Sequence, residues 1–253
     1  LNSCNVATVA VASYLLGRDP HEQIDYTDPT TFLRLLAAML AGSLTSGFMG
    51  AMMETPSMTH EWPENFAYWA SSELVNFIAL LPLMIHFPLR SKRAALEEKL
   101  PRNWGVLSWL PAAAFILSLL ASMKVSGLVA LAIPVPALLW CALVYHRFFV
   151  SLLSFIFIMW NLLAIGSGLI DYTADFSSRT EIMSTRLGVA LVALAPLFVS
   201  TALAMQKDMS VRLRNLAERD ALTGVLNRRT FWDRAEQYFR ARPGDETILA
   251  IVA

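Results

Sequence analysis

The sequence predicts an all-α polytopic membrane bundle of about seven helical spans, the first incomplete, followed by a cytoplasmic signalling helix. The first helix and strand of an α/β domain are expected after it. Of the 253 residues, 56% are hydrophobic and only 16% are charged, with a mean hydropathy of +0.50. A soluble domain of this length needs more polar surface to cover its core. The apolar residues also form long blocks, and the composition becomes charged after residue 206.

Seven apolar segments are candidates for membrane spans. A helix needs about 20 apolar residues to cross a hydrocarbon core of about 30 Å. The shortest segment stands at the start of a sequence that begins with Leu, so we expect a fragment with its first span incomplete. The segments are Cys4–Leu16, Leu33–Met53, Tyr68–Leu89, Val106–Ser122, Val125–Tyr145, Phe148–Ile170 and Leu187–Met205.

The distribution of Lys and Arg predicts the orientation of the spans. The loop between Arg90 and Arg102 is strongly basic, which is typical of the cytoplasmic side. Glu54–Ala67 contains no Lys or Arg and is expected to face outward. Alternation from there makes Asp171–Arg186 an outer loop and leaves the C-terminus in the cytoplasm. Membrane lipid is therefore an expected partner, whereas the net charge of zero gives no reason to expect binding to nucleic acid.

Two features inside the spans predict helix packing. Ser43, Gly47 and Ala51 recur every four residues, so they form a face of small residues that favours close contact with another helix. Pro134 and Pro136 interrupt the hydrogen bonds of the fifth span and are expected to kink it.

Polar side chains inside the spans are candidate sensor residues. Glu73 and Asn76 are three residues apart and share one helical face. A carboxylate in hydrocarbon is costly, which makes it a functional candidate. Alternatively, Glu73 lies near the outer interface or is satisfied by a neighbouring helix. Asn161 and Asp171, on the sixth span and at its outer end, are candidate members of a shared polar cavity.

Residues 1–206 resemble the MASE-type integral membrane sensor domains. The resemblance rests on Phe66–Leu83 (FAYWASSELVNFIALLPL), on Ile133–Leu143 (IPVPALLWCAL) and on the spacing of the apolar segments. Such sensors are joined to cyclase, phosphodiesterase or histidine kinase outputs, so this resemblance does not choose among them. None of the four histidines lies beyond His146, which disfavours a histidine kinase.

Residues 207–219 are predicted to be a linker helix that continues the last span. No Gly or Pro interrupts it, and Val211, Leu213, Leu216 and Ala217 form a narrow apolar stripe. The stripe suits a two-stranded coiled coil, although it covers fewer than three heptads. A solvated linker helix is the alternative.

The segment after the linker predicts a helix stop and a restart. In Asp220-x-Leu-Thr-Gly the Asp and Thr side chains can bond backbone groups, and Gly permits a left-handed turn. A second helix is expected from Asn227, with Phe231, Ala235 and Phe239 on one face. A turn at Arg242–Asp245 and a buried strand at Thr247–Ala253 are expected to follow.

Asp220–Phe231 (DALTGVLNRRTF) resembles the opening of a GGDEF domain, the diguanylate cyclase module of bacterial signalling proteins. The resemblance implies that residues 220–253 are the N-terminal part of a truncated GGDEF domain. It also implies a role for the motif in coupling input to output. We expect either that role or simple capping and packing for Asp220, Leu222, Thr223, Asn227, Arg228 and Arg229.

The same resemblance implies that the intact protein joins two GTP molecules into cyclic di-GMP, with Mg²⁺ as cofactor. It implies a homodimer through the linker helix and GGDEF domain, in the bacterial inner membrane. The chain is expected to end before the catalytic residues, so no catalytic, cofactor-binding or metal residue is assigned. Two alternatives are a degenerate GGDEF domain coupled to a cyclic di-GMP phosphodiesterase and a transporter-like membrane protein.

Overall fold

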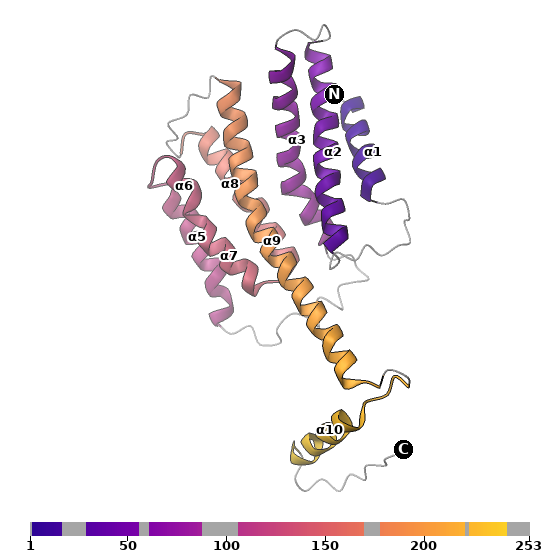
Figure 1. The fold of residues 1–253 in the computed structure, drawn as a ribbon. Coiled ribbons are helices and arrows are strands. Elements are labelled where there is room, and N and C mark those ends of the chain that lie inside the picture. Colours follow the sequence, from indigo (N-terminus) through magenta and orange to yellow (C-terminus); the bar gives the residue numbers. More distant parts are fainter. Residues whose placement is uncertain are drawn as a thin grey trace. The chain divides into compact units, whose positions relative to one another are not determined.

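The computed structural model describes residues 2–16, 29–55, 61–87, 106–169, 178–220 and 223–241, which form helices and connecting turns (Figure 1). The chain divides into two compact units, Leu1–Ala204 and Met205–Ala253. The finer division of the chain into a sensor domain (1–206), a linker helix (207–219) and the start of a further domain (220–253) stays a prediction.

Three helices of the first unit pack side by side: α1 (Asn2–Leu16), α2 (Pro29–Glu54) and α3 (Trp62–Ile85) (Figure 1). The small-residue face of α2 explains the close contact with α3. A Cβ atom added at Gly47 would lie 2.8 Å from the Cβ of Ala70 and 2.9 Å from the carbonyl oxygen of Phe66. Ser43 and Ala51, on the same face, are also buried. The packing role predicted for this face is therefore confirmed.

The next elements are a 3₁₀ turn, η2 (Val106–Trp109), and the helices α5 (Leu110–Ser122), α6 (Leu128–Ala132), α7 (Pro134–Val144) and α8 (Arg147–Gly166). The predicted fifth span is interrupted where its prolines begin, since α6 ends at Ala132 and α7 begins at Pro134. Tyr145, after α7, donates a hydrogen bond from its hydroxyl to the Ser108 carbonyl oxygen at 2.7 Å, which ties α7 to the start of α5.

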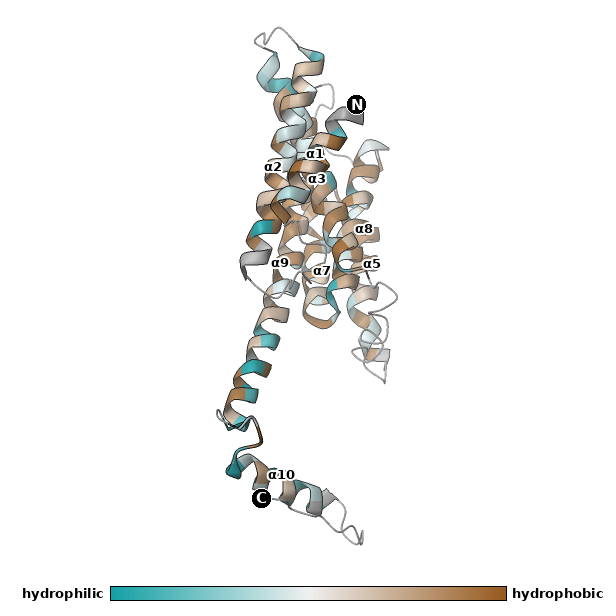
Figure 2. Ribbon diagram, turned by 90° about the vertical axis from the view of Figure 1, so that its right-hand side faces the viewer, coloured by the Kyte–Doolittle hydropathy of each residue, from teal (hydrophilic) through white to brown (hydrophobic). Residues whose placement is uncertain are grey.

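One long helix, α9 (Arg179–Glu218), contains the last predicted span and the predicted linker. Its 40 residues run without a break, so the predicted continuation of the span into the linker is confirmed. The hydropathy changes along it, with mostly apolar residues from Leu187 to Met205 and hydrophilic ones toward its C-terminal end (Figure 2). A turn separates α9 from α10 (Arg228–Ala241), as the predicted stop and restart require.

The core of the first unit combines residues from α2, α3 and α5 to α9. Phe115, Phe157 and Ile158 are almost fully buried in it. Large apolar side chains also cover the outside, among them Leu107, which is 79% exposed, and Leu163, which is 70% exposed. Such a surface is unfavourable in water and suits a hydrocarbon environment.

Within the described ranges, four helices are long and apolar enough to cross a membrane, which is compatible with a membrane protein. They are Leu33–Glu54, Trp62–Ile85, Arg147–Gly166 and Arg179–Glu218. Asn5–Leu16, Leu107–Ser122 and Val129–Val144 are apolar but shorter. Each predicted span overlaps at least one described helix, yet the count of about seven stays a prediction.

Two segments predicted as outer loops are partly helical. Residues Arg179–Arg186 form the first two turns of α9, and α3 begins at Trp62 instead of Tyr68. Pro63 stands in the first turn of α3, where its missing N–H has no partner to lose. The start of α9 is stabilised by contacts of its arginines with α3. The predicted turn at Arg242–Asp245 and strand at Thr247–Ala253 lie outside the described residues.

Candidate functional site: the joint between α9 and α10

The chain turns back on itself between the two helices of the second unit. Arg219 and Leu226 form an antiparallel β-bridge. The backbone N–H of Asp220 donates to the carbonyl oxygen of Val225 at 2.8 Å. The guanidinium of Arg219 closes the loop from its side chain, donating to the carbonyl oxygen of Gly224 at 2.7 Å. These contacts make the connection a closed loop with a defined geometry.

Asp220 organises the turn inside this loop. Its Oδ1 atom accepts hydrogen bonds from the backbone N–H and from the hydroxyl of Thr223, both at 2.9 Å. Gly224 adopts φ +70°, the left-handed conformation that glycine reaches at the lowest cost. The Gly224 N–H then donates to the carbonyl oxygen of Asp220 at 2.9 Å. The Asp, Thr and Gly of the motif are thus the residue types that this turn requires.

Asn227 connects the ends of both helices. Its Oδ1 atom accepts from the N–H of Thr230 at 2.9 Å, which caps the N-terminus of α10. Its Nδ2 atom donates to the carbonyl oxygen of Ala217 at 2.5 Å, in the last turn of α9. Its backbone N–H donates to the carbonyl oxygen of Glu218 at 2.8 Å. One side chain therefore satisfies an orphan donor of one helix and an orphan acceptor of the other.

Glu218 adds an ionic bridge across the joint. Its carboxylate oxygens contact Arg214 of α9 and Arg234 of α10, each at 2.5 Å. The hydrogen bond from Arg214 lowers the pKa of the Glu218 carboxyl. Partial desolvation raises this pKa, and the hydrogen bond from Arg234 lowers it further. The same bond to Glu218 raises the pKa of Arg214. Charge and hydrogen bonding therefore hold α10 against the end of α9.

The structure brings together Asp220, Thr223 and Asn227 of the predicted coupling residues. Arg228 is exposed. The side chain of Arg229 is 93% exposed, and its ion pair within the described residues is with Asp233 at 4.0 Å. Neither arginine contributes to the described contacts of the joint. Leu222 lies outside the described residues.

Sequence reasoning missed the bridging role of Glu218 and the contribution of Arg234. The spacing of Arg214 and Glu218 by four residues was the available signal, because such residues are neighbours on a helix. No local pattern connects Glu218 with Arg234, sixteen residues further along the chain.

The predicted sensor residues lie on α3 and α8 of the first unit. Asn76 donates from Nδ2 to Oε2 of Glu73 at 3.3 Å, as their spacing on one face predicts. Asn161 is fully buried and donates to the carbonyl oxygen of Phe157 at 2.8 Å, whereas its Oδ1 has no hydrogen-bond partner among the described residues. No described hydrogen bond joins Asn161 to Glu73, and Asp171 lies outside the described residues. The shared polar cavity therefore stays a prediction.

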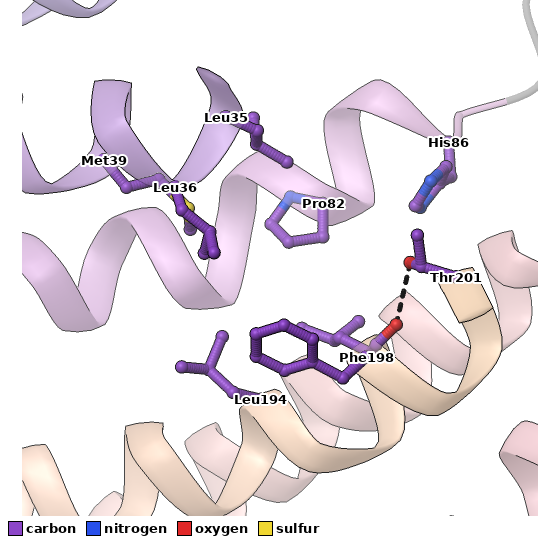
Figure 3. Close-up of a pocket in the computed structure, with 9 residues that line it drawn as sticks. Leu35, Leu36, Met39, Pro82, His86, Leu194, Phe198 and Thr201 are labelled. Carbon is purple, nitrogen blue, oxygen red and sulfur yellow. Dashed lines mark hydrogen bonds between the residues drawn. The ribbon is translucent and has the colours of Figure 1, made fainter. Parts of the chain in front are cut away.

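The first unit also contains a small cavity between α2, α3 and α9, shown in Figure 3. Its volume of about 30 Å³ leaves room for little more than one water molecule. His86 lines it and shares a hydrogen bond of 2.9 Å with the hydroxyl of Ser151. The lining is otherwise mostly apolar: Leu35, Leu36, Met39, Pro82, Leu194, Leu197, Phe198 and Thr201. This cavity offers no room for an organic ligand.

Comparisons with known proteins relate the chain to diguanylate cyclases. It is 27% identical over 229 residues, 90% of the chain, to the protein named Probable diguanylate cyclase DgcF of Escherichia coli O157:H7. It is 30% identical over 163 residues, 64% of the chain, to the protein of the same name of Escherichia coli strain K12. These matches cover 47% and 49% of the two relatives, so the chain spans about half their length. No family model and no solved structure matches the chain.

Proposed function

We propose that the intact protein is a membrane-bound signal sensor whose output is a diguanylate cyclase that joins two GTP molecules into cyclic di-GMP. The similarity to two proteins named as probable diguanylate cyclases supports this reaction. The resemblance of Asp220–Phe231 to the opening of a GGDEF domain supports it independently of the membrane segments. The apolar helices support a membrane location, and the distribution of Lys and Arg supports a cytoplasmic C-terminus in a bacterial inner membrane.

The catalytic step belongs to residues outside those described here. Phosphoryl transfer to a 3′-hydroxyl needs alignment of two nucleotides and neutralisation of the developing charge, which Mg²⁺ would supply. No group of three His, Cys, Asp or Glu side chains that could hold a metal ion is found within the described ranges.

The role that we propose for this part of the chain is transmission. The observation that carries it is Asn227, which bonds the last turn of α9 and the first turn of α10 with one side chain. A joint held in this way makes the orientation of α10 follow that of α9. In a homodimer, a signal at the membrane helices would change the pairing of the two α9 helices and shift the population toward the productive alignment of two cyclase domains.

The reaction is tested with the purified full-length protein in lipid nanodiscs. Incubation with GTP and Mg²⁺ is expected to yield cyclic di-GMP, identified by mass spectrometry, with two pyrophosphates released per product. Failure to form this product at any protein concentration, or hydrolysis of added cyclic di-GMP in its place, would contradict the proposed reaction. A reporter fused after Ala253 tests the location, because we expect a cytoplasmic reporter to be active and a periplasmic one to be inactive.

A further inference from the structure

Two arginine side chains of α9 converge on one aromatic ring of α3. The Cζ atoms of Arg179 and Arg186 each lie 5.4 Å from the centroid of the Tyr68 ring. At this distance the negative face of an aromatic ring attracts a guanidinium group. The two arginines are seven residues apart, which corresponds to about 10 Å along a helix. The Tyr68 ring therefore contacts two guanidinium groups whose residues are two turns apart on α9.

Polar groups of α3 hold the two guanidinium groups in place. Arg179 donates to Oδ1 of Asn65, and Arg186 donates to the hydroxyl of Ser72 at 2.9 Å. Asn65 and Ser72 are also seven residues apart, so the spacing on α3 matches the spacing on α9. Each guanidinium carries five N–H donors, and the described contacts occupy only part of them. Some donors of both guanidinium groups therefore have no acceptor among the contacts of the described residues.

The cluster carries an excess of positive charge. Glu54 lies 3.3 Å from Arg179 and pairs with it. Within the described part of the chain, Arg186 contacts the neutral Ser72 hydroxyl and the Tyr68 ring. The N-terminus of the 40-residue helix α9 adds a partial positive charge at the same end. Among the groups that these contacts join, two guanidinium groups stand against one carboxylate, so a further anion would be attracted electrostatically.

The cluster is partly exposed, with Arg186 half-buried. The side chains of Arg179 and Glu54 are 48% and 36% exposed, whereas Asn65 is buried beneath them. Trp62 and Trp69 of α3 flank this level of the helix, and such residues are enriched where a membrane meets water. An anion can therefore reach the arginines from the aqueous phase or from the headgroup layer.

We propose that Arg179, Arg186 and Tyr68 form a binding site for an oxyanion, a phosphate or carboxylate group with at least two acceptor oxygens. Guanidinium groups bind such groups through paired hydrogen bonds, and two of them can share one anion. The anion comes either from a small solute or from the headgroup of an anionic lipid. The site does not depend on the proposed cyclase activity, because its ligand is detected by binding.

The test uses the full-length protein in phosphatidylcholine nanodiscs and radiolabelled inorganic phosphate at constant ionic strength. Equilibrium dialysis is expected to show saturable binding of one phosphate per chain. Arg186→Gln and Arg179→Gln are each expected to weaken it at least tenfold, whereas Arg186→Lys keeps the charge and retains part of the affinity. Arg34→Gln is the matched control, because Arg34 is an exposed arginine of α2 outside the cluster and its loss should leave binding unchanged.

A second arm separates the two sources of the anion. The protein is reconstituted in nanodiscs that contain phosphatidylglycerol and is then released from them. Native mass spectrometry counts the lipid molecules that remain bound to it. Retention by the wild type but not by Arg186→Gln, without saturable binding of free phosphate, assigns the site to a lipid headgroup. The proposal is overturned if neither ligand binds, or if both Arg186→Gln and Arg179→Gln bind as the wild type does. Unchanged melting temperatures of the ligand-free variants establish that they fold.

Discussion

Asn227 donates a hydrogen bond from Nδ2 to the carbonyl oxygen of Ala217 at 2.5 Å, so the residue that caps the N-terminus of α10 also closes the last turn of α9. A capping asparagine normally serves one helix. Here the amide nitrogen of one side chain bonds α9 and its amide oxygen bonds α10. A single planar group therefore helps to fix the direction of α10 relative to the end of α9. This relationship is the structural basis for the proposed transmission through the joint.

Replacing Asn227 by Ala removes the cap of α10 and the bond to Ala217. Each loss costs about 1 kcal/mol, so the population of the open joint should increase about tenfold or more. Hydrogen exchange of the Thr230 amide in the full-length protein measures this opening. Gln237→Ala is the control, since Gln237 is an exposed amide of α10 outside the joint. Equal exchange rates in the two variants would show that the described bonds do not hold the joint.

Gly224 has φ +70°, and an alanine in this conformation costs about 1–2 kcal/mol. Gly224→Ala is therefore expected to destabilise the turn. Gly224→Asn should destabilise it less, because Asn tolerates the left-handed region. No atom of the described residues lies within 4 Å of an added Cβ, so the difference between the two variants reports backbone conformation and not a clash. Exchange of the Asn227 amide measures both variants. An alanine variant as well protected as the wild type would contradict the described turn.

The joint should depend on the ionisation of Glu218. Its pKa is lowered in the folded protein, so the stabilisation is fully present above the ordinary value of 4.5 and is lost as the pH falls through the lowered pKa. A ¹³C titration of the Glu218 carboxyl measures the midpoint. Arg214→Gln should raise this midpoint, and Arg234→Gln should raise it as well. A midpoint that stays the same in both variants would exclude the ionic bridge.

Gly47→Ala should destabilise the first unit. The new Cβ would approach the Phe66 carbonyl oxygen to 2.9 Å, so α2 and α3 must separate, at a cost of about 1–3 kcal/mol. Gly188→Ala is the matched control, because Gly188 also lies inside a helix with a long apolar stretch, but within the described ranges no atom stands within 4 Å of its added Cβ. The melting temperature in detergent should fall for the first variant only. A fall of equal size in both would point to a general intolerance of substitution.

The turn after α9 could be predicted because its chemistry is local. Asp220, Thr223 and Gly224 are residue types that few other backbone conformations require in this order. The bridge from Glu218 to Arg234 could not be predicted, because it depends on where the loop directs α10. The start of α9 was missed for a similar reason. Arg179 and Arg186 look like loop residues by hydropathy, and their partners Asn65 and Ser72 stand 114 positions earlier in the chain.

The most direct test compares the rigidity of the joint with cyclase activity in the same full-length protein. Spin labels at Ser210→Cys and Gln237→Cys, with Cys4 and Cys141 replaced by serine and labelled chains diluted with unlabelled ones, give the distance distribution between α9 and α10. We expect a narrow distribution in the wild-type background. With Asn227→Ala we expect a broad distribution together with a loss of cyclic di-GMP synthesis of about tenfold. An unchanged rate of synthesis in a variant whose distribution has broadened would contradict transmission through the joint.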